Sequence, residues 1–254
     1  TQAVHWKTKE GLVRMCACRG TAGFAHVSCL AEQAKILVAE GEENNLGDDR
    51  FMPRWRQWYA CSLCEQDYHG VMRRALGWAC WKTYLGRPER DNLRGLAMGQ
   101  LGNGLFAGKS LEDALSVYKA ELSTLRRLGA SADSILIVQA NLANTYQCLG
   151  RLEEALSLLQ EIYSLRLKLS GEEHISTIIA ANNYAESLRG LDRLDEAKLL
   201  LRRTIPVARR VLGECVLLTL TMKKIYAQTL YKDPAATLND LREAVTTLEE
   251  IERT

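Results

Sequence analysis

The stretch ANNYAESLRGLDRLDEA (Ala181–Ala197) shows most clearly how this chain of 254 residues is built. Its small residues Ala185 and Ala197 stand where the two helices of one hairpin would cross closely. Small residues recur at the place of Ala185 with separations of 41, 42 and 42 residues, at Gly102, Ala143, Ala185 and Ala227. Similarity at a fixed period of this size is the signature of a solenoid of stacked units. The sequence therefore predicts a mainly α-helical repeat protein.

A second small residue follows twelve positions later in three units, each time after a Leu and two acidic residues: Ala114, Ala155 and Ala197. This pattern resembles the tetratricopeptide repeat, in which helix A carries a Gly or Ala and helix B an Ala. The segment Leu169–His174, followed by Thr177, is similar to the inter-repeat segment of kinesin-light-chain-like tetratricopeptide proteins. The resemblance implies a tetratricopeptide-like α-solenoid of helical hairpins that binds a protein or peptide partner.

The expected domain organisation follows from these patterns. Four repeats are predicted in residues 89–254, at about 89–130, 131–172, 173–214 and 215–254. In the fourth, Asn239 stands where the helix B alanine belongs, so this unit is either a cap or a shifted repeat. Residues 69–88 are expected to form a connecting helix, and residues 1–68 a small zinc-finger domain with a helical insertion at about 30–60. Within that insertion, Pro53 is expected to begin a short helix.

Potential zinc ligands crowd the first quarter of the chain: Cys16, Cys18, His26, Cys29, Cys61 and Cys64. Thiolate and imidazole are the usual ligands of structural zinc, and they often come in closely spaced pairs. A Cys-x-Cys, a His-x-x-Cys and a Cys-x-x-Cys together favour a metal site over unligated buried thiols, which single cysteines often are. A disulfide framework remains a third option, although it suits small secreted domains better.

Residues 10–68 resemble the second half of a RING-CH zinc finger, in which Leu30, Leu63 and Tyr68 also have counterparts. The resemblance implies that Cys16, Cys18, Cys61 and Cys64 share one zinc, and that His26 and Cys29 form half of a second site. The family's opening Cys pair has no match in residues 1–15. It is expected upstream of Thr1, unless His5 stands in for it. Gln33 occupies the place where the family often has the Trp that grips a ubiquitin-conjugating enzyme.

Two functions follow from these resemblances. The first is a zinc-binding protein-interaction protein that acts as a RING-type ubiquitin-protein ligase, whose finger docks a conjugating enzyme while the repeats choose the substrate. The alternative is a non-enzymatic scaffold or adaptor with a structural zinc. No catalytic residue is expected in either case. The sequence has no phosphate-binding glycine loop, no His-Glu-x-x-His helix and no Gly-x-Ser-x-Gly elbow.

The predicted partner site is a groove lined by the A helices. In tetratricopeptide arrays, the residues two before and one after the small residue of helix A point into it. In this chain they are Gln100, Asn103, Asn141, Asn144, Asn183, Glu186 and Gln228. Carboxamides both donate and accept hydrogen bonds, which suits the backbone of an extended peptide. Arg189 and Lys224 fall near the same face and favour an acidic partner. The alternative is that all these residues are solvated and bind nothing.

Bulk composition argues against other partners. The formal net charge is +2 and 25% of residues are charged, which gives no attraction to nucleic acid or membrane. No apolar run approaches the roughly 18 residues of a membrane-spanning helix, and no leader peptide is recognised. The expected location is therefore cytoplasmic or nuclear.

Overall fold

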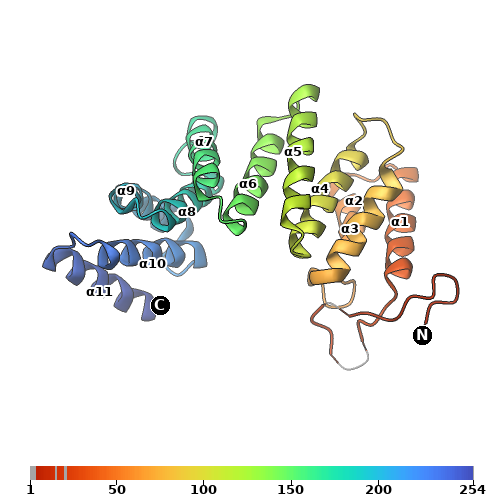
Figure 1. The fold of residues 1–254 in the computed structure, drawn as a ribbon, viewed down its shortest axis with the longest axis horizontal. Helices are drawn as coiled ribbons and strands as arrows, with labels where there is room; N and C mark the ends of the chain where they lie inside the picture. Colours follow the sequence, from red (N-terminus) through yellow and green to blue (C-terminus); the bar gives the residue numbers. More distant parts are fainter. Residues whose placement is uncertain (1–3, 15, 20–21, 254) are drawn as a thin grey trace. The chain divides into compact units, whose positions relative to one another are not determined.

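The structure, a computed structural model, describes residues 4–14, 16–19 and 22–253 (Figure 1). These residues form eleven α-helices and one short 3-10 helix: α1 Val27–Glu43, α2 Asp48–Trp55, η1 Arg56–Trp58, α3 Gly70–Tyr84, α4 Asn92–Ala107, α5 Leu111–Leu128, α6 Ala132–Cys148, α7 Leu152–Ser170, α8 Ile175–Gly190, α9 Leu194–Leu212, α10 Leu217–Lys232 and α11 Leu238–Glu252. Extended pairing in the same residues is limited to three isolated antiparallel bridges, Val4–Gly11, Val13–Ala25 and Ala60–Asp67. The prediction of a mainly α-helical solenoid is confirmed.

The internal contacts divide the chain into two compact units, residues 1–138 and 139–254, and the division falls inside α6. In the described part of both, no helix is long and apolar enough to cross a membrane.

The first unit contains an aromatic core built from the insertion and α3. Trp55 and Trp58 are 1% exposed, and their rings lie 5.6 and 6.0 Å from the ring of Tyr84. The prediction that Pro53 begins the short helix is wrong, because α2 begins at Asp48 and contains Pro53 in its interior. Acidic side chains in the first turn interact favourably with the helix dipole, and Asp48 and Asp49 supply that signal here.

Helices α3 and α4 touch backbone to backbone. A Cβ on Gly77 would lie 2.7 Å from the carbonyl oxygen of Gln100, and one on Gly104 would lie 2.8 Å from that of Arg73. No larger residue fits at either position without moving a helix. Helix α3, within the segment expected to connect finger and repeats, therefore packs directly on α4.

The periodic small residues lie at helix crossings, as predicted. Those that are alanines are fully buried: Ala114, Ala143, Ala155, Ala185, Ala197 and Ala227. At Gly102, a Cβ would lie 2.4 Å from the buried ring of Tyr118, so this crossing is closer still.

In the second unit, α7 to α11 pack in chain order (Figure 1). Helix α11 begins eleven residues after Ala227, whereas α9 begins nine residues after Ala185. The extra residues lie in the turn before Thr237, which caps α11 in a reciprocal capping box with Asp240. Asn239 is exposed on α11, and Ala244 is buried against α10.

Glu121 on α5 is a buried carboxyl group whose Oε2 has no hydrogen-bond partner in the described part of the chain. Burial raises its pKa from the ordinary 4.5 to about 7. A carboxyl with a raised folded-state pKa contributes most to stability below pH 4.5, and that contribution is lost as pH rises through 7. We expect Glu121→Gln to raise the free energy of unfolding by about 3 kcal/mol at pH 8 and to change it little at pH 4. Urea unfolding at the two pH values measures this, and an equal effect at both would contradict it.

Candidate metal centre and repeat groove

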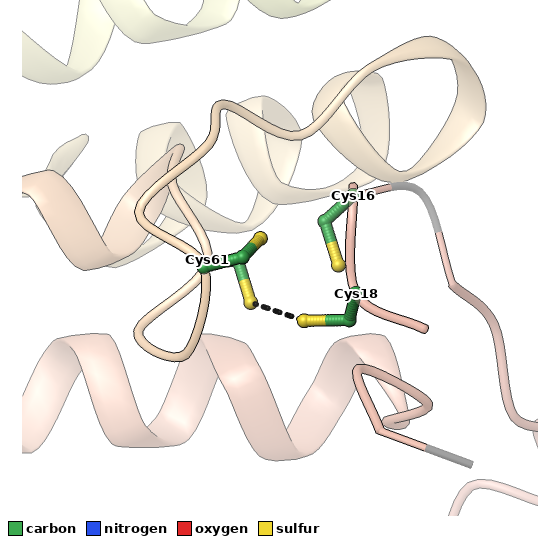
Figure 2. Close-up of side chains that lie close together, drawn as sticks. Cys16, Cys18 and Cys61 are labelled. Atoms are coloured by element: carbon green, nitrogen blue, oxygen red, sulfur yellow. Dashed lines mark hydrogen bonds between the residues drawn. The ribbon is translucent and has the colours of Figure 1, made fainter. Parts of the chain in front are cut away.

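The four cysteines predicted to share a zinc come together in the first unit. The Sγ atoms of Cys16, Cys18, Cys61 and Cys64 all lie within 4.8 Å of one another. Figure 2 shows Cys16 and Cys18 on one segment, facing Cys61 across the gap, and the Sγ atoms of Cys18 and Cys61 are 3.7 Å apart. Tetrahedral zinc with Zn–S bonds of about 2.3 Å requires sulfurs about 3.8 Å apart. The donor set therefore fits a zinc ion.

Local backbone structure places these thiols. Cys61 and Cys64 lie in a tight turn in which Cys61 N–H donates to the Gln66 carbonyl and Glu65 N–H donates to the Cys61 carbonyl, both at 2.9 Å. Glu65 has a positive φ of 58°, which closes the turn. On the other side, Gly23 has a φ of 77°, and a Cβ there would lie 2.6 Å from Cβ of Cys18. The turn and the glycine bring both pairs to one point.

Two of these thiols, Cys18 and Cys64, have pKa values shifted in opposite directions without a cation. Desolvation raises the pKa of Cys18 to about 12, and a hydrogen bond with Cys64 adds to the effect. The backbone N–H of Gln66 lowers the pKa of Cys64 to about 7. A divalent cation would remove this difference in protonation, because thiols that coordinate a cation are deprotonated outright. All eight cysteines of the chain are free, so the disulfide option is excluded in this structure.

The cluster also belongs to a small hydrophobic core. Cys61 packs with Tyr68, Met72 and Leu76, and the other three cysteines pack at the edge of this group. Met72 and Leu76 lie on α3, so the cluster anchors that helix. Cys80, also on α3, is fully buried in the aromatic core and is a packing residue.

The two remaining predicted ligands lie at the start of α1. His26 is 4% exposed, and its Nδ1 lies 3.8 Å from Sγ of the exposed Cys29. They are not part of the four-cysteine cluster.

The second unit contains a hollow of about 700 Å³. Seven residues of the predicted groove line it: Asn141, Asn144, Asn183, Glu186, Arg189, Lys224 and Gln228. Six further lining residues were not predicted: Ala140, Gln147, Leu159, Asn182, Thr221 and Ile225. Two of these had a signal, since Gln147 lies three residues after Asn144 and Thr221 three before Lys224, hence on the same helix faces.

Gln100 and Asn103 do not line this hollow. Both lie on α4 in the first unit, where Asn103 Oδ1 accepts a hydrogen bond of 2.8 Å from the Tyr118 hydroxyl. Asn103 thus holds the buried ring that packs on Gly102.

The hollow has an uneven charge pattern. Arg189 donates to both carboxylate oxygens of Glu186, at 2.9 and 2.5 Å, and this pairing raises the pKa of Arg189. Lys224 is exposed and makes no ion pair with any residue that the structure describes. Asn182 Nδ2 donates to Asn183 Oδ1 at 3.2 Å, while the buried Oδ1 of Asn182 has no partner among the described residues. The hollow therefore offers a ligand the unpaired ammonium group of Lys224 and the free hydrogen-bond acceptor Oδ1 of Asn182.

Comparison with known proteins supports the repeats. Residues 134–210 match the tetratricopeptide repeat family model. Similar solved structures are the nearly identical TPR-like repeats of a Podosopora anserina putative kinesin light chain (16% identity, TM-score 0.60, 90% of this chain and 95% of that one) and BtubC (BKLC) from P. vanneervenii (14% identity, TM-score 0.64, 90% and 91%). A third is Bacillus thuringiensis PlcR in complex with the peptide PapR7 and DNA (14% identity, TM-score 0.50, 89% and 70%).

At these identities the solved structures show the fold alone. No curated protein matches the chain, and no RING-CH family model matches it. The chain thus has the fold of a helical repeat solenoid, residues 134–210 are similar to tetratricopeptide repeats, and the first unit holds a cysteine cluster that could bind a metal ion.

Proposed function

We propose that this protein is a scaffold or adaptor that binds an extended acidic segment of a partner protein in the hollow of residues 139–254. A zinc ion on Cys16, Cys18, Cys61 and Cys64 stabilises its N-terminal part. The observation that carries the proposal is the lining of the hollow, which combines carboxamides on successive A helices with an unpaired lysine.

The carboxamides suit a peptide backbone. Asn141 and Asn144 lie on α6, Asn182 and Asn183 on α8, and Gln228 on α10. A backbone N–H of an extended ligand can satisfy the buried Oδ1 of Asn182, and a buried acceptor without a partner costs about 1–3 kcal/mol. This gives binding that does not depend on the ligand's side chains.

The charged residues of the hollow, Lys224 and Arg189, determine which side chains of the ligand are preferred. Lys224 can pair with a carboxylate of the ligand without breaking an existing ion pair, whereas Arg189 must first release Glu186. We therefore place the preferred acidic residue of the ligand at Lys224. PlcR, similar in fold, is known in complex with a peptide, which supports the view that such an array can hold one.

The zinc in this proposal is structural. Four cysteine ligands would fill the tetrahedral coordination of the zinc ion, so no position would be left for a substrate. The binding free energy of such a closed site stabilises the fold directly.

A ubiquitin ligase is a second candidate, favoured by the convergence of the four cysteines in the RING-CH order. The exposed Gln33 on α1 argues against it, because the Trp that grips the conjugating enzyme is absent from that position. A discharge assay decides between the two candidates. If the protein accelerates the loss of ubiquitin from a charged conjugating enzyme, the scaffold proposal is too narrow.

The groove is tested by selecting peptides from a random phage-displayed library and titrating the best synthetic peptide. We expect selected peptides to be rich in Asp and Glu. Lys224→Ala should weaken binding about tenfold, equivalent to about 1.4 kcal/mol. Asn183→Ala should weaken it by a similar factor, because a ligand group then loses its partner.

Asn239→Ala is the matched control, since this exposed carboxamide on α11 lies outside the hollow. It should leave affinity unchanged. Selected peptides without acidic residues, or equal binding by wild type and Lys224→Ala, would refute the groove assignment.

A further inference from the structure

Helix α3 in the first unit has a row of exposed apolar side chains along one face. Val71, Trp78 and Leu85 are 51%, 43% and 46% exposed in the part of the chain that the structure describes. They are spaced seven residues apart, and residues with this spacing lie on one face of a helix. Ala75 and Lys82 occupy the intervening positions of the same heptad pattern. We call these five residues the α3 stripe.

The other sides of α3 are used for packing within the first unit. The helix packs on α4 and also contacts α1 (Figure 1). Its residues Met72, Leu76 and Cys80 are buried in the core around the cysteine cluster and in the aromatic core. Single exposed apolar residues are ordinary on a protein surface, whereas an aligned row of them is typical of an interaction site.

The charge around the stripe is positive. Residues 68–88 contain no Asp or Glu and four basic residues, Arg73, Arg74, Lys82 and Arg87. Lys82 lies in the stripe itself, is exposed, and pairs with no carboxylate among the described residues. Arg74 lies beside the stripe, where its guanidinium donates to the neutral hydroxyl group of Ser110 at 3.3 Å. A ligand of the stripe therefore meets apolar side chains and uncompensated positive charge.

We propose that the α3 stripe binds an amphipathic helix of a partner protein, whose apolar seam is flanked by acidic residues. The stripe is about 22 Å long, which is four turns of a helix. Its side chains offer apolar contacts and one cation but no carboxamide, in contrast to the hollow of residues 139–254. The ligand must therefore satisfy its own backbone hydrogen bonds, which a helix does and an extended segment does not.

Two other occupants fit less well. A second copy of the chain would bring the basic residues of two α3 helices together, and contacts between like charges are unfavourable. A helix that lies on a lipid surface has a wide apolar face and a polar face rich in Lys and Arg. The α3 stripe is instead one narrow seam with a single lysine in it.

A synthetic peptide of three heptads tests the proposal, with Leu at both seam positions of each heptad and Glu at the flanking positions. Fluorescence anisotropy of the labelled peptide, titrated with the full chain, measures its affinity. We expect binding, with a gain of peptide helicity in circular dichroism. Trp78→Ala should weaken binding about thirtyfold, because a tryptophan at the centre of an interface usually dominates the affinity. Lys82→Glu should weaken it about tenfold.

Two controls isolate the stripe. Ile36→Ala removes an exposed apolar side chain from α1, in the same unit but outside the stripe, and should leave the affinity unchanged. Lys224→Ala, in the hollow, should also leave it unchanged. A peptide with Lys in place of every Glu should bind Lys82→Glu more tightly than wild type. This comparison holds even if Trp78→Ala fails to fold.

Several outcomes would overturn the proposal. The first is no binding of the acidic peptide by the folded wild-type chain, and the second is equal affinity of wild type for the acidic and basic peptides. Loss of binding in Lys224→Ala would place the peptide in the hollow instead. Sedimentation of wild type but not Trp78→Ala with phosphatidylserine vesicles would assign the stripe to a membrane surface. A dimer in light scattering that Trp78→Ala abolishes would assign the stripe to self-association.

Discussion

Replacing both Cys61 and Cys64 with serine is expected to abolish zinc binding at the four-cysteine site and to unfold residues 10–76, while the helices of residues 139–254 stay folded. Structural zinc sites contribute on the order of 10 kcal/mol to the folding of the segments that they join. Cys16 and Cys18 pack against the core around Cys61, and Cys18 Sγ lies 3.7 Å from Cys61 Sγ, so a shared metal ion would join the two segments directly. Hydrogen exchange followed by mass spectrometry should show lost protection in this region.

The loss should extend into α3, beyond the finger itself. Met72 and Leu76 are almost fully buried under the cysteine core and would become exposed. Cys148→Ser serves as the control, because Cys148 is an exposed free thiol on α6. Protection that persists in residues 10–76 of the double mutant would mean that the metal is dispensable for folding. Unfolding of residues 139–254 along with them would contradict the independence of the repeats.

Periodic features of this chain were predictable, because a solenoid imposes the same packing requirement in every unit. Only a small side chain lets helices A and B cross closely, so Ala143, Ala185 and Ala227 mark the crossings in sequence as well as in space. The short spacings of the cysteines predicted metal binding. The grouping of Cys16, Cys18, Cys61 and Cys64 at one site was implied by the resemblance to the RING-CH finger.

Features that occur once were harder to predict. The contact of Gly77 with α4 belongs to no repeat, and nothing in the sequence distinguishes this glycine from the uncrowded Gly95. The repeat pattern also cannot tell where the surface is hollow. It selected Asn103, which instead accepts a hydrogen bond from Tyr118, and it passed over Asn182, whose neighbour Asn183 fits the pattern.

Gly77→Ala is expected to destabilise the first unit by about 3 kcal/mol, the upper end of the usual cost of overpacking. The added Cβ would meet the Gln100 carbonyl oxygen at 2.7 Å and the Cα of Gly104 at 3.3 Å. Both obstacles are backbone atoms, so no side-chain rotation can relieve the clash. Helices α3 and α4 must separate, which also loosens the core around Leu76 and Ala97. Chemical unfolding followed by tryptophan fluorescence measures the effect, because Trp55 and Trp58 lie in the same unit.

Gly95→Ala separates this steric effect from the general preference of helices for alanine. Gly95 lies on α4 with nothing within 4 Å of its added Cβ. Alanine there should stabilise the helix by about 0.5–1 kcal/mol, because glycine loses more backbone entropy on folding. Opposite signs for the two substitutions are therefore expected from the same chemical change. If Gly77→Ala were also stabilising, α3 and α4 would not pack backbone to backbone in solution, and the anchoring of the metal centre to the repeats through α3 would have to be abandoned.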